Sequence, residues 1–366
     1  MGWTRRAVLT SGALTLSGCT ASLSTDPVAD RPSIDRDIDA TIGFGGDAML
    51  GRSVNERWAG RDPAGVWDGL RSRLQSLDGF VCNLECCISD GGERWPDKVY
   101  SFRADPEFAI PALTAAGTSA VSLANNHTLD FGTTALDDTL DHLDDADIGA
   151  AGAGQRRAAA LEPAVVDIGG LTVAVVAFTD RFRPYRAGFD SPGTAYLPLD
   201  PERRRTRQAV RRSLRQASER SPDLVVASLH WGPNWVVAPN RTQQRFARWL
   251  VDEGVDVVHG HSAHVLQGIE TYRGRPILYD TADIVDDYVV KEHLHNDRSG
   301  LFELVVERGE LAGVRVVPVE IDDEAVGPAS SDAAAWVRDR IRTLSGEFGT
   351  RIEREDDDLW IPLHDA

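Results

Sequence analysis

Five times along this sequence, an apolar run ends at side chains that are typical metal ligands. They are carboxylate, amide and imidazole groups: Asp47, Glu85, Asn126 with His127, His230, and His261 with His264. Nitrogen and oxygen donors of these kinds suit divalent Mn, Fe or Zn in a reactive site, and not a thiolate-bound structural zinc. Two such ions, about 3.5–4 Å apart, can stabilise the attacking and the leaving oxygen of a displacement reaction, and they supply hydroxide near neutral pH. The pattern therefore predicts metal-assisted hydrolysis or transfer at a phosphoryl or acyl centre.

The densest of these stretches runs from Ser122 to Gly132 and packs two amides, an imidazole and a carboxylate into six residues. It follows an apolar strand predicted at 120–123 and precedes a helix predicted from Thr133. In open α/β sheets, ligands bind outside the carboxyl ends of the strands, where such a loop lies. Within it, Asn125 and Asp130 are interpreted as supports of the loop.

The hydrophobic periodicity predicts alternating strands and helices, which is typical of an α/β fold. Strands are expected at 40–44, 79–82, 120–123, 164–168, 171–178, 224–229, 255–258, 277–280, 301–306 and 314–321. Helices are expected at 64–77, 106–116, 133–145, 201–219, 241–253 and 333–344. A second sheet is expected to start at the hairpin of 164–178. The pair Gly45-Gly46 is expected to turn the backbone sharply and so present Asp47.

Other common sites do not fit the sequence. Gly260-His261-Ser262-Ala263-His264 has histidine where a serine nucleophile elbow needs its second glycine. Gly149–Gly154 reverses the dinucleotide-binding fingerprint, and no phosphate-binding loop ends in Gly-Lys-Ser or Gly-Lys-Thr. Serine hydrolysis and nucleotide-driven chemistry are therefore not expected.

The N-terminus resembles an export signal. Arg5-Arg6 precedes a short uncharged apolar segment, as in twin-arginine signals, and Leu16-Ser17-Gly18-Cys19 resembles a lipobox. Residues 1–19 are thus predicted to be an export signal with a lipobox, in which cleavage before Cys19 leaves that residue to carry lipid. Residues 20–38 are predicted to be a flexible tether. The protein is expected at the outer face of the cytoplasmic membrane, lipid-anchored. The alternative is an ordinary secretory signal with an incidental cysteine.

The charge balance excludes some partners. The formal charge is −18, and removal of residues 1–18 would take away two arginines and leave −20. Such a surface repels nucleic acid, which is not an expected partner. Lys98 and Lys291 are the only lysines, whereas aspartate and arginine are plentiful. This imbalance suggests an organism that lives in high salt, where screening removes the self-repulsion.

Two further features each leave two interpretations. Arginines recur at i+4 spacing on the helix predicted at 201–219, namely Arg203, Arg207, Arg211 and Arg215. This stripe either meets a polyanionic chain or balances acidic residues nearby. Cys82, Cys86 and Cys87 are either buried thiols or include a local Cys82–Cys86 bridge.

Five motifs in this order resemble the CapA family of poly-γ-glutamate capsule biosynthesis proteins, over about residues 40–290. The motifs are Gly46-Asp47-Ala48-Met49-Leu50-Gly51-Arg52, Asn83-Leu84-Glu85, Ala124-Asn125-Asn126-His127 with Asp130 and Gly132, His230-Trp231-Gly232, and Gly260-His261-Ser262-Ala263-His264-Val265. That family is similar to calcineurin-like metallophosphoesterases. The resemblance implies a four-layer α/β/β/α sandwich, with a domain at 39–325 and a C-terminal helix and tail of the same domain at 326–366.

The resemblance also implies roles for individual residues. Asp47, Glu85, Asn126, His230, His261 and His264 would bind metal, with two ions expected. His127 would be a general acid or would stabilise the transition state, with Asn126 beside it. The implied partners are poly-γ-glutamate or a related envelope polymer and a membrane synthase complex.

Two points leave the activity open. Asp47 lacks the Asp-x-His pairing usual in metallophosphoesterases, and Asp283 lies where the family has an amide. Asp283 either replaces that amide or holds its loop. The alternative to a hydrolase is a non-catalytic factor that binds the polymer or assembles a synthase.

Overall fold

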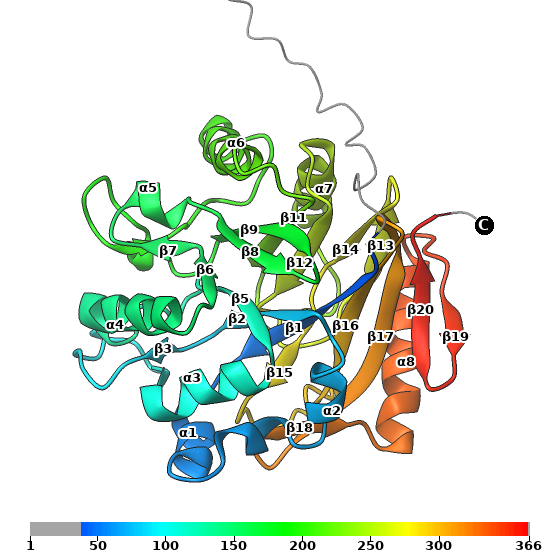
Figure 1. Ribbon diagram of the computed structural model, residues 1–366, viewed down its shortest axis with the longest axis horizontal. Coiled ribbons are helices and arrows are strands. Elements are labelled where there is room, and N and C mark those ends of the chain that lie inside the picture. The colour runs from blue at the N-terminus through cyan, green and yellow to red at the C-terminus, as the bar shows by residue number, and fades with distance from the viewer. Residues whose placement is uncertain (1–37, 365–366) are drawn as a thin grey trace, which may run out of the picture.

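Two β-sheets form the framework of the computed structural model, which describes residues 38–364 (Figure 1). The larger sheet has the spatial order β19 (Glu353–Glu355), β20 (Asp358–Pro362), β17 (Glu310–Asp322), β16 (Arg298–Glu307), β1 (Ala40–Ala48), β2 (Gly79–Leu84), β5 (Thr118–Ser122), β6 (Gly149–Ala151), with β15 (Asp283–Val285) paired to β1 and β18 (Ala325–Pro328) to β17. The smaller sheet has the order β13 (Ile269–Tyr272), β14 (Arg275–Leu278), β12 (Val257–His261), β11 (Leu224–His230), β9 (Leu171–Thr179), β8 (Ala164–Ile168).

Short elements and helices complete the described chain. The two short strand pairs are β3 (Cys87–Ile88) with β4 (Arg103–Ala104), and β7 (Ala153–Gly154) with β10 (Gly193–Thr194). The helices are α1 (Arg52–Trp58), α2 (Arg71–Leu74), α3 (Pro106–Ala115), α4 (Gly132–Asp145), α5 (Arg157–Ala160), α6 (Arg204–Ser218), α7 (Arg241–Asp252) and α8 (Ser331–Gly346), with 3₁₀ turns η1 (Pro63–Trp67) and η2 (Arg183–Tyr185). Within this range, no helix has the length and apolarity needed to cross a bilayer. The predicted signal, Cys19 and the tether up to residue 37 lie outside the described residues.

Alternating side chains on the central strands build the four layers. On β9, Val173 and Val175 belong to a core between the two sheets, whereas Ala174 and Val176 face an outer core with α6 and α7. On β2, Val81 joins the inner core and its neighbours face an outer core with α1, α3 and α4. Because successive side chains of a strand point to opposite faces, each sheet is covered on both sides. The predicted α/β/β/α sandwich is confirmed.

The helix expected at 64–77 is wrong. The segment forms η1 and the single-turn α2 instead. A Cβ atom on Gly65 would lie 2.1 Å from the Trp58 ring, and one on Gly69 would lie 2.6 Å from the Cα of Gly327. Close packing thus requires both glycines, and glycine weakens a helix because of its backbone freedom.

Other boundaries also differ from the periodicity. The strand expected at 255–258 is shifted to Val257–His261, so that His259 and His261 are strand residues. The strands β18, β19 and β20 were not predicted. β20 pairs with β17 through a register that joins Val316 to Leu359, so the C-terminal tail adds to the larger sheet. Tertiary pairing, which local sequence does not encode, decides these elements.

The sharp turn expected at Gly45-Gly46 is wrong, since β1 continues through Asp47. The register between β1 and β2 shifts between Phe44 and Asp47, as in a bulge. A Cβ atom on Gly46 would lie 1.8 Å from the carbonyl oxygen of Ala282. The glycine therefore lets the segment before β15 approach β1, and this contact aligns Asp283 with Asp47.

We expect Gly46→Ala to destabilise the protein by about 3 kcal/mol, because the methyl group has no space against the Ala282 carbonyl. Urea unfolding measures the change. Gly346→Ala is the matched control: a Cβ there meets nothing within 4 Å, and it lies at the end of α8. The control should keep wild-type stability or gain slightly. Equal losses in both variants would contradict the close approach.

The three cysteines of the described chain, Cys82, Cys86 and Cys87, are buried and free. The interpretation as buried thiols is confirmed, and the local bridge is wrong. Burial, with the charge of Asp47, raises the pKa of the Cys82 thiol from 9.0 to about 12. The folded state therefore holds this proton more tightly than the unfolded state does.

This shift predicts a loss of stability at alkaline pH. A raised pKa contributes stability below the unfolded value near 9, and the contribution disappears as the pH rises toward 12. At pH 10.5 the raised pKa of the Cys82 thiol should have lowered the free energy of unfolding by about 2 kcal/mol. We expect the stability difference between wild type and Cys82→Ala, measured in urea, to shrink by that amount between pH 8 and 10.5. For Val121→Ala, on the strand position paired with Cys82, the difference should stay constant.

Candidate metal centre

Parallel pairing brings the predicted site residues to one edge of the sandwich. β1 runs parallel to β2 and β15, and β11 runs parallel to β12. Asp47 is near the end of β1, Glu85 directly follows β2, and His230 and His261 are the last residues of their strands. His230 and His261 are also register partners. The carboxyl ends of strands from both sheets therefore meet around Asp47.

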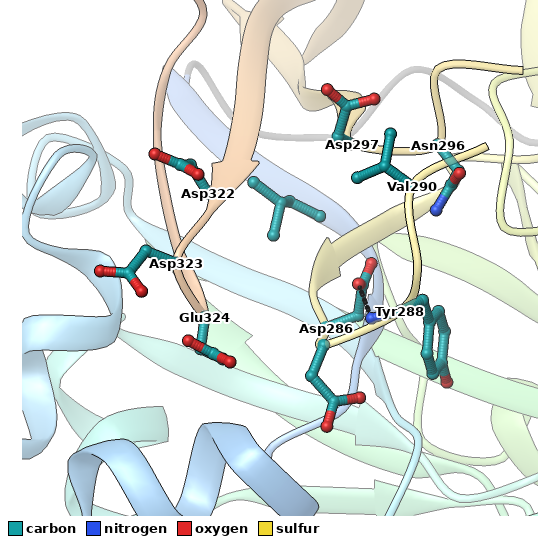
Figure 2. Close-up of a pocket in the computed structure, with 10 residues that line it drawn as sticks. Asp286, Tyr288, Val290, Asn296, Asp297, Asp322, Asp323 and Glu324 are labelled. Atoms are coloured by element: carbon teal, nitrogen blue, oxygen red, sulfur yellow. Dashed lines mark hydrogen bonds between the residues drawn. The ribbon is translucent and has the colours of Figure 1, made fainter. Parts of the chain in front are cut away.

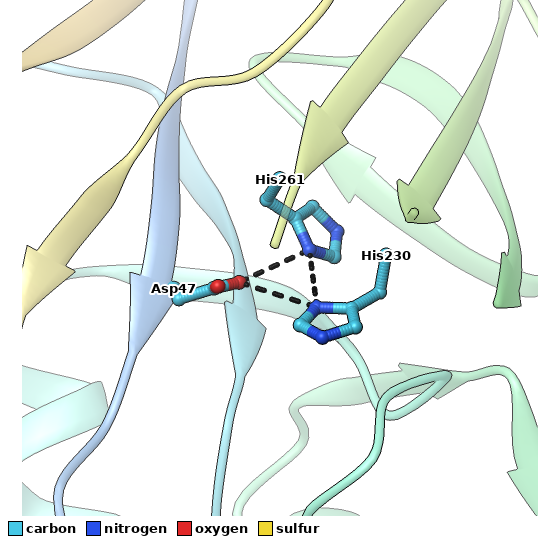
Figure 3. Close-up of side chains that lie close together, drawn as sticks. All are labelled: Asp47, His230 and His261. Atoms are coloured by element: carbon cyan, nitrogen blue, oxygen red, sulfur yellow. Dashed lines mark hydrogen bonds and ion pairs between the residues drawn. The ribbon is translucent and has the colours of Figure 1, made fainter. Parts of the chain in front are cut away.

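The first group of candidate ligands consists of Asp47, His230 and His261, all buried (Figure 3). Oδ1 of Asp47 lies 3.0 Å from Nδ1 of His261 and 3.5 Å from Nδ1 of His230. The two Nδ1 atoms are 3.0 Å apart. Burial lowers the pKa of His230 to about 3, so the ring is neutral near pH 7, which is the form that binds metals.

The second group consists of Asp47, Glu85, His264 and Asp283, also buried. Nδ1 of His264 lies 3.4 Å from Oδ2 of Asp47 and 2.8 Å from Oδ1 of Asp283. Asp47 belongs to both groups and offers one oxygen to each side. The sequence left Asp283 either as a replacement for the amide of the family or as a support of its loop. Its position among these side chains favours a role as metal ligand.

Unpartnered oxygens indicate that this cluster needs a cation. Oδ2 of Asp47, Oε1 of Glu85 and Oδ2 of Asp283 are buried without a hydrogen-bond partner. Burial, followed by the charge of Asp47, raises the pKa of Glu85 well above its ordinary value. Burial and the neighbouring carboxylates also raise the pKa of Asp283 well above its ordinary value. Like charges at such distances are compensated by a metal, so the donor set fits a divalent ion.

Asn126 and His127 lie beside these groups. Oδ1 of Asn126 is 2.6 Å from Nε2 of His230, and Nε2 of His127 is 4.0 Å from Oε1 of Glu85. The His127 ring stacks on Phe102 with centroids 3.7 Å apart. The structure thus brings together all seven residues that the sequence singled out.

Asp130 fixes the orientation of His127. Its Oδ2 lies 2.6 Å from Nδ1 of His127 and accepts a hydrogen bond from the backbone N–H of Phe102. Its Oδ1 accepts from the Tyr185 hydroxyl and from the ammonium of Lys98. Burial lowers the pKa of His127 to about 4. The ring is therefore neutral near pH 7, with Nε2 directed at the metal cluster, where it can accept a proton; the resemblance implied a general acid or a stabiliser of the transition state.

Asn125 supports the same loop. Its side-chain amide donates to the Leu84 carbonyl and to Oδ1 of Asn83, and its oxygen accepts from the backbone N–H of His127. This agrees with the supporting role inferred for Asn125 and Asp130.

Sequence reasoning missed three groups that orient the site. The Asn83 amide donates to Oδ1 of Asp47 over 2.8 Å, and the Tyr288 hydroxyl donates to Oε2 of Glu85 over 2.8 Å. Lys98 contacts Asp130 and the Asn126 carbonyl. Asn83 lies two residues before Glu85 in its motif, which was a usable signal. Tyr288 and Lys98 follow no apolar run, so the pattern did not reveal them.

An acidic cavity of about 220 Å³ adjoins the centre (Figure 2). Its carboxylates come from the segment after β15, from the loop before β16, and from the end of β17 and the turn that follows: Asp286, Asp287, Asp297, Asp322, Asp323 and Glu324. Burial raises the pKa of Asp286 to about 6.

Comparisons with known proteins agree with the five motifs. Residues 41–288 match the family described as bacterial capsule synthesis protein PGA_cap. A probable polyglutamine synthesis accessory protein of Mycobacterium tuberculosis is 34% identical, over 87% of this chain and 94% of its own. The PGA biosynthesis protein CapA of Bacillus subtilis is 26% identical, over 79% of this chain and 74% of its own.

Solved structures are more distant. A hypothetical protein from Thermus thermophilus aligns with 76% of this chain and 99% of its own, at a TM-score of 0.45 and 16% identity. A 5'-nucleotidase from Candida albicans aligns with 86% of this chain and 58% of its own, at a TM-score of 0.43 and 10% identity. Likenesses at this level do not identify an activity. The family match covers most of the chain and confirms the resemblance to CapA, so this protein belongs to the bacterial capsule synthesis protein family PGA_cap.

Proposed function

We propose that this protein is a divalent-metal-dependent hydrolase that acts on an anionic envelope polymer of the poly-γ-glutamate type, or on its attachment. The observation that carries the proposal is the shared position of Asp47 between two ligand groups whose buried oxygens lack partners. The polymer comes from the names of relatives, which include a PGA biosynthesis protein CapA.

Two ions are proposed, with Mn, Fe or Zn as the metal. Asp47, His230 and His261, with Asn126 beside them, would hold one ion, and Asp47, Glu85, His264 and Asp283 would hold the other. When bound, such ions polarise a phosphoryl or acyl oxygen and lower the pKa of water. Asn83 and Tyr288 orient the carboxylates of Asp47 and Glu85. His127, held through Nδ1 by Asp130, would accept or return a proton at Nε2.

The proposed location is the outer face of the cytoplasmic membrane, with lipid on Cys19. Support comes from Arg5-Arg6, the short apolar segment and the lipobox-like Leu16–Cys19. Globomycin, an inhibitor of the lipoprotein signal peptidase, tests this in cells. We expect the inhibitor to cause accumulation of the precursor, and Cys19→Ala to release the protein from the membrane fraction. Membrane retention of Cys19→Ala would contradict the anchor.

A second candidate function is that of a non-catalytic factor which assists a membrane synthase. The specific observation in its favour is the name of the Mycobacterium tuberculosis relative, an accessory protein for polymer synthesis. In this case the metal cluster would stabilise a binding surface, and His127 would not be needed for polymer at the cell surface.

A complemented deletion strain separates the two candidates. Wild type, His127→Ala and Asp47→Asn are expressed in the strain, and polymer at the cell surface is quantified. The hydrolase proposal expects both variants to fail. Full polymer with His127→Ala, but none with Asp47→Asn, would favour the accessory factor. In parallel, purified metal-loaded protein is incubated with γ-glutamyl amides and phosphodiesters, and if none is cleaved the hydrolase proposal fails.

A further inference from the structure

The outer face of α6 carries a concentration of positive charge that the metal centre does not use. Six exposed arginines lie at or on this helix: Arg203, Arg204, Arg205, Arg211, Arg212 and Arg215. The whole chain carries a formal charge of −18 and only two lysines. In Figure 1, α6 lies at the periphery of the molecule, on the side of the smaller sheet. A basic helix of this kind stands out from the rest of the surface.

Neighbouring acids account for only part of this charge. Arg211 forms a bidentate pair with Glu253, at 2.6 and 2.7 Å, and Arg203 lies 3.6 Å from Asp200. Within the part of the chain that the structure describes, the side chains of Arg204, Arg205, Arg212 and Arg215 have no acidic partner within 4.0 Å. In the stripe Arg203, Arg207, Arg211 and Arg215, local acid thus pairs with Arg203 and Arg211, whereas the exposed Arg215 and the neighbouring Arg204, Arg205 and Arg212 lack such a partner among the described residues.

The helix is fixed in place by its opposite side. Val210 and Ala217 are fully buried in the core beneath the smaller sheet, and the Ser213 hydroxyl donates to the Leu161 carbonyl. Fifteen residues give a length of about 22 Å. The exposed guanidinium groups thus form an extended row on a rigid element, longer than any single small anion.

The first turn of α6 is joined to the edge that holds the metal centre. The hydroxyl of Thr179, at the end of β9, donates to the His230 carbonyl, and Thr179 itself accepts from the backbone N–H of Leu197. The Thr206 hydroxyl of α6 donates to the Pro198 carbonyl. At the other end, the N–H of Asp223 donates to Thr172, near the start of β9. The helix therefore runs from the edge of the metal centre to the opposite edge of the sheet.

We infer that the arginine row of α6 is a docking surface for an extended polycarboxylate, which it holds along the molecule with one end directed toward the metal centre. The choice of a polycarboxylate rests on the proposed function, in which the substrate is a polymer of the poly-γ-glutamate type. Guanidinium groups bind carboxylates with paired N–H donors, and several weak exposed contacts add up along a polymer. A row of this length selects chains with many charges over single anions.

An anionic bilayer is the less suitable partner for the row. Large exposed apolar side chains are absent from α6; those of the described chain lie elsewhere, at Val99, Tyr100, Val165, Phe189, Val236, Val289 and Val290. A helix that lies in a membrane interface needs an exposed apolar face beside its basic face.

Binding of fluorescently labelled poly-γ-glutamate to the full chain, measured by anisotropy at 50 and 200 mM salt, tests the inference. The test variant is the triple change Arg205→Glu, Arg212→Glu, Arg215→Glu, and glutamate keeps helix propensity. The matched control carries the same charge change at exposed arginines outside α6: Arg61→Glu, Arg308→Glu, Arg351→Glu. We expect the test variant to bind at least about tenfold more weakly than the control at low salt, with a smaller salt dependence.

Three results would overturn the inference: no polymer binding by wild type, equal weakening in both triple variants, or stronger binding to phosphatidylglycerol vesicles than to polymer. Cleavage of small γ-glutamyl or phosphodiester substrates is measured in the same samples. The test variant should keep it, because α6 contributes no side chain to the metal centre. Polymer binding through α6 without any cleavage would reject the hydrolase while the docking surface stands.

Discussion

Asp47→Asn is expected to remove both metal ions and to lower turnover of any cleaved substrate by at least about 1,000-fold. The reason is geometric: Asp47 is the one residue common to both ligand groups. The substitution keeps the shape of the side chain but removes the negative charge that faces His261 on one side and His264 on the other. Metal content by inductively coupled plasma mass spectrometry measures the loss, and circular dichroism checks that the variant is folded.

Single-group variants serve as controls for this prediction. Glu85→Gln affects only the second group and should leave about one ion per chain. His261→Gln affects only the first group and should also leave about one. Wild type should hold two. If Asp47→Asn keeps as much metal as either control, Asp47 does not bridge two sites.

His127→Ala should retain the metal but lose activity by about 100- to 10,000-fold, the range typical of a removed proton-transfer group. His127 lies outside both ligand groups, and its Nε2 is 4.0 Å from Oε1 of Glu85. Removal of the ring also leaves Asp130 without its contact to Nδ1, but the loop should keep its shape through Tyr185, Lys98 and the Phe102 backbone. Steady-state kinetics with metal analysis on the same sample checks both parts.

The exposed His293 provides the matched control, since His293→Ala should change neither metal content nor kcat. A further variant, Asp130→Asn, separates proton transfer from mere packing. If Asp130 sets the tautomer of His127, this variant should lower kcat and change the pH dependence of kcat while KM stays near wild type. A large loss of metal in His127→Ala would instead make His127 a ligand and contradict the assignment.

The sequence by itself determined the elements of the site. Apolar runs that end in Asp47, Glu85, His230 and His261 predict strand ends, and ligands of α/β sheets bind at the carboxyl ends of strands. The types of donor then predict a divalent metal. The motifs also identified the family over about residues 40–290, and the family match over residues 41–288 confirms it. Residue type and order suffice for these conclusions because each depends on local periodicity and on side-chain chemistry.

Only the tertiary structure decided which residues meet. The division into two groups around Asp47 depends on the pairing of β11 with β12 and of β1 with β15, and these contacts span more than 200 residues for Asp47 and Asp283. The support of Glu85 by Tyr288 and of Asp130 by Lys98 is also non-local. Gly46 was expected to form a turn, whereas it makes room for the Ala282 carbonyl. Such contacts arise from the packing of segments that are distant in the sequence. No local sequence pattern therefore reveals them.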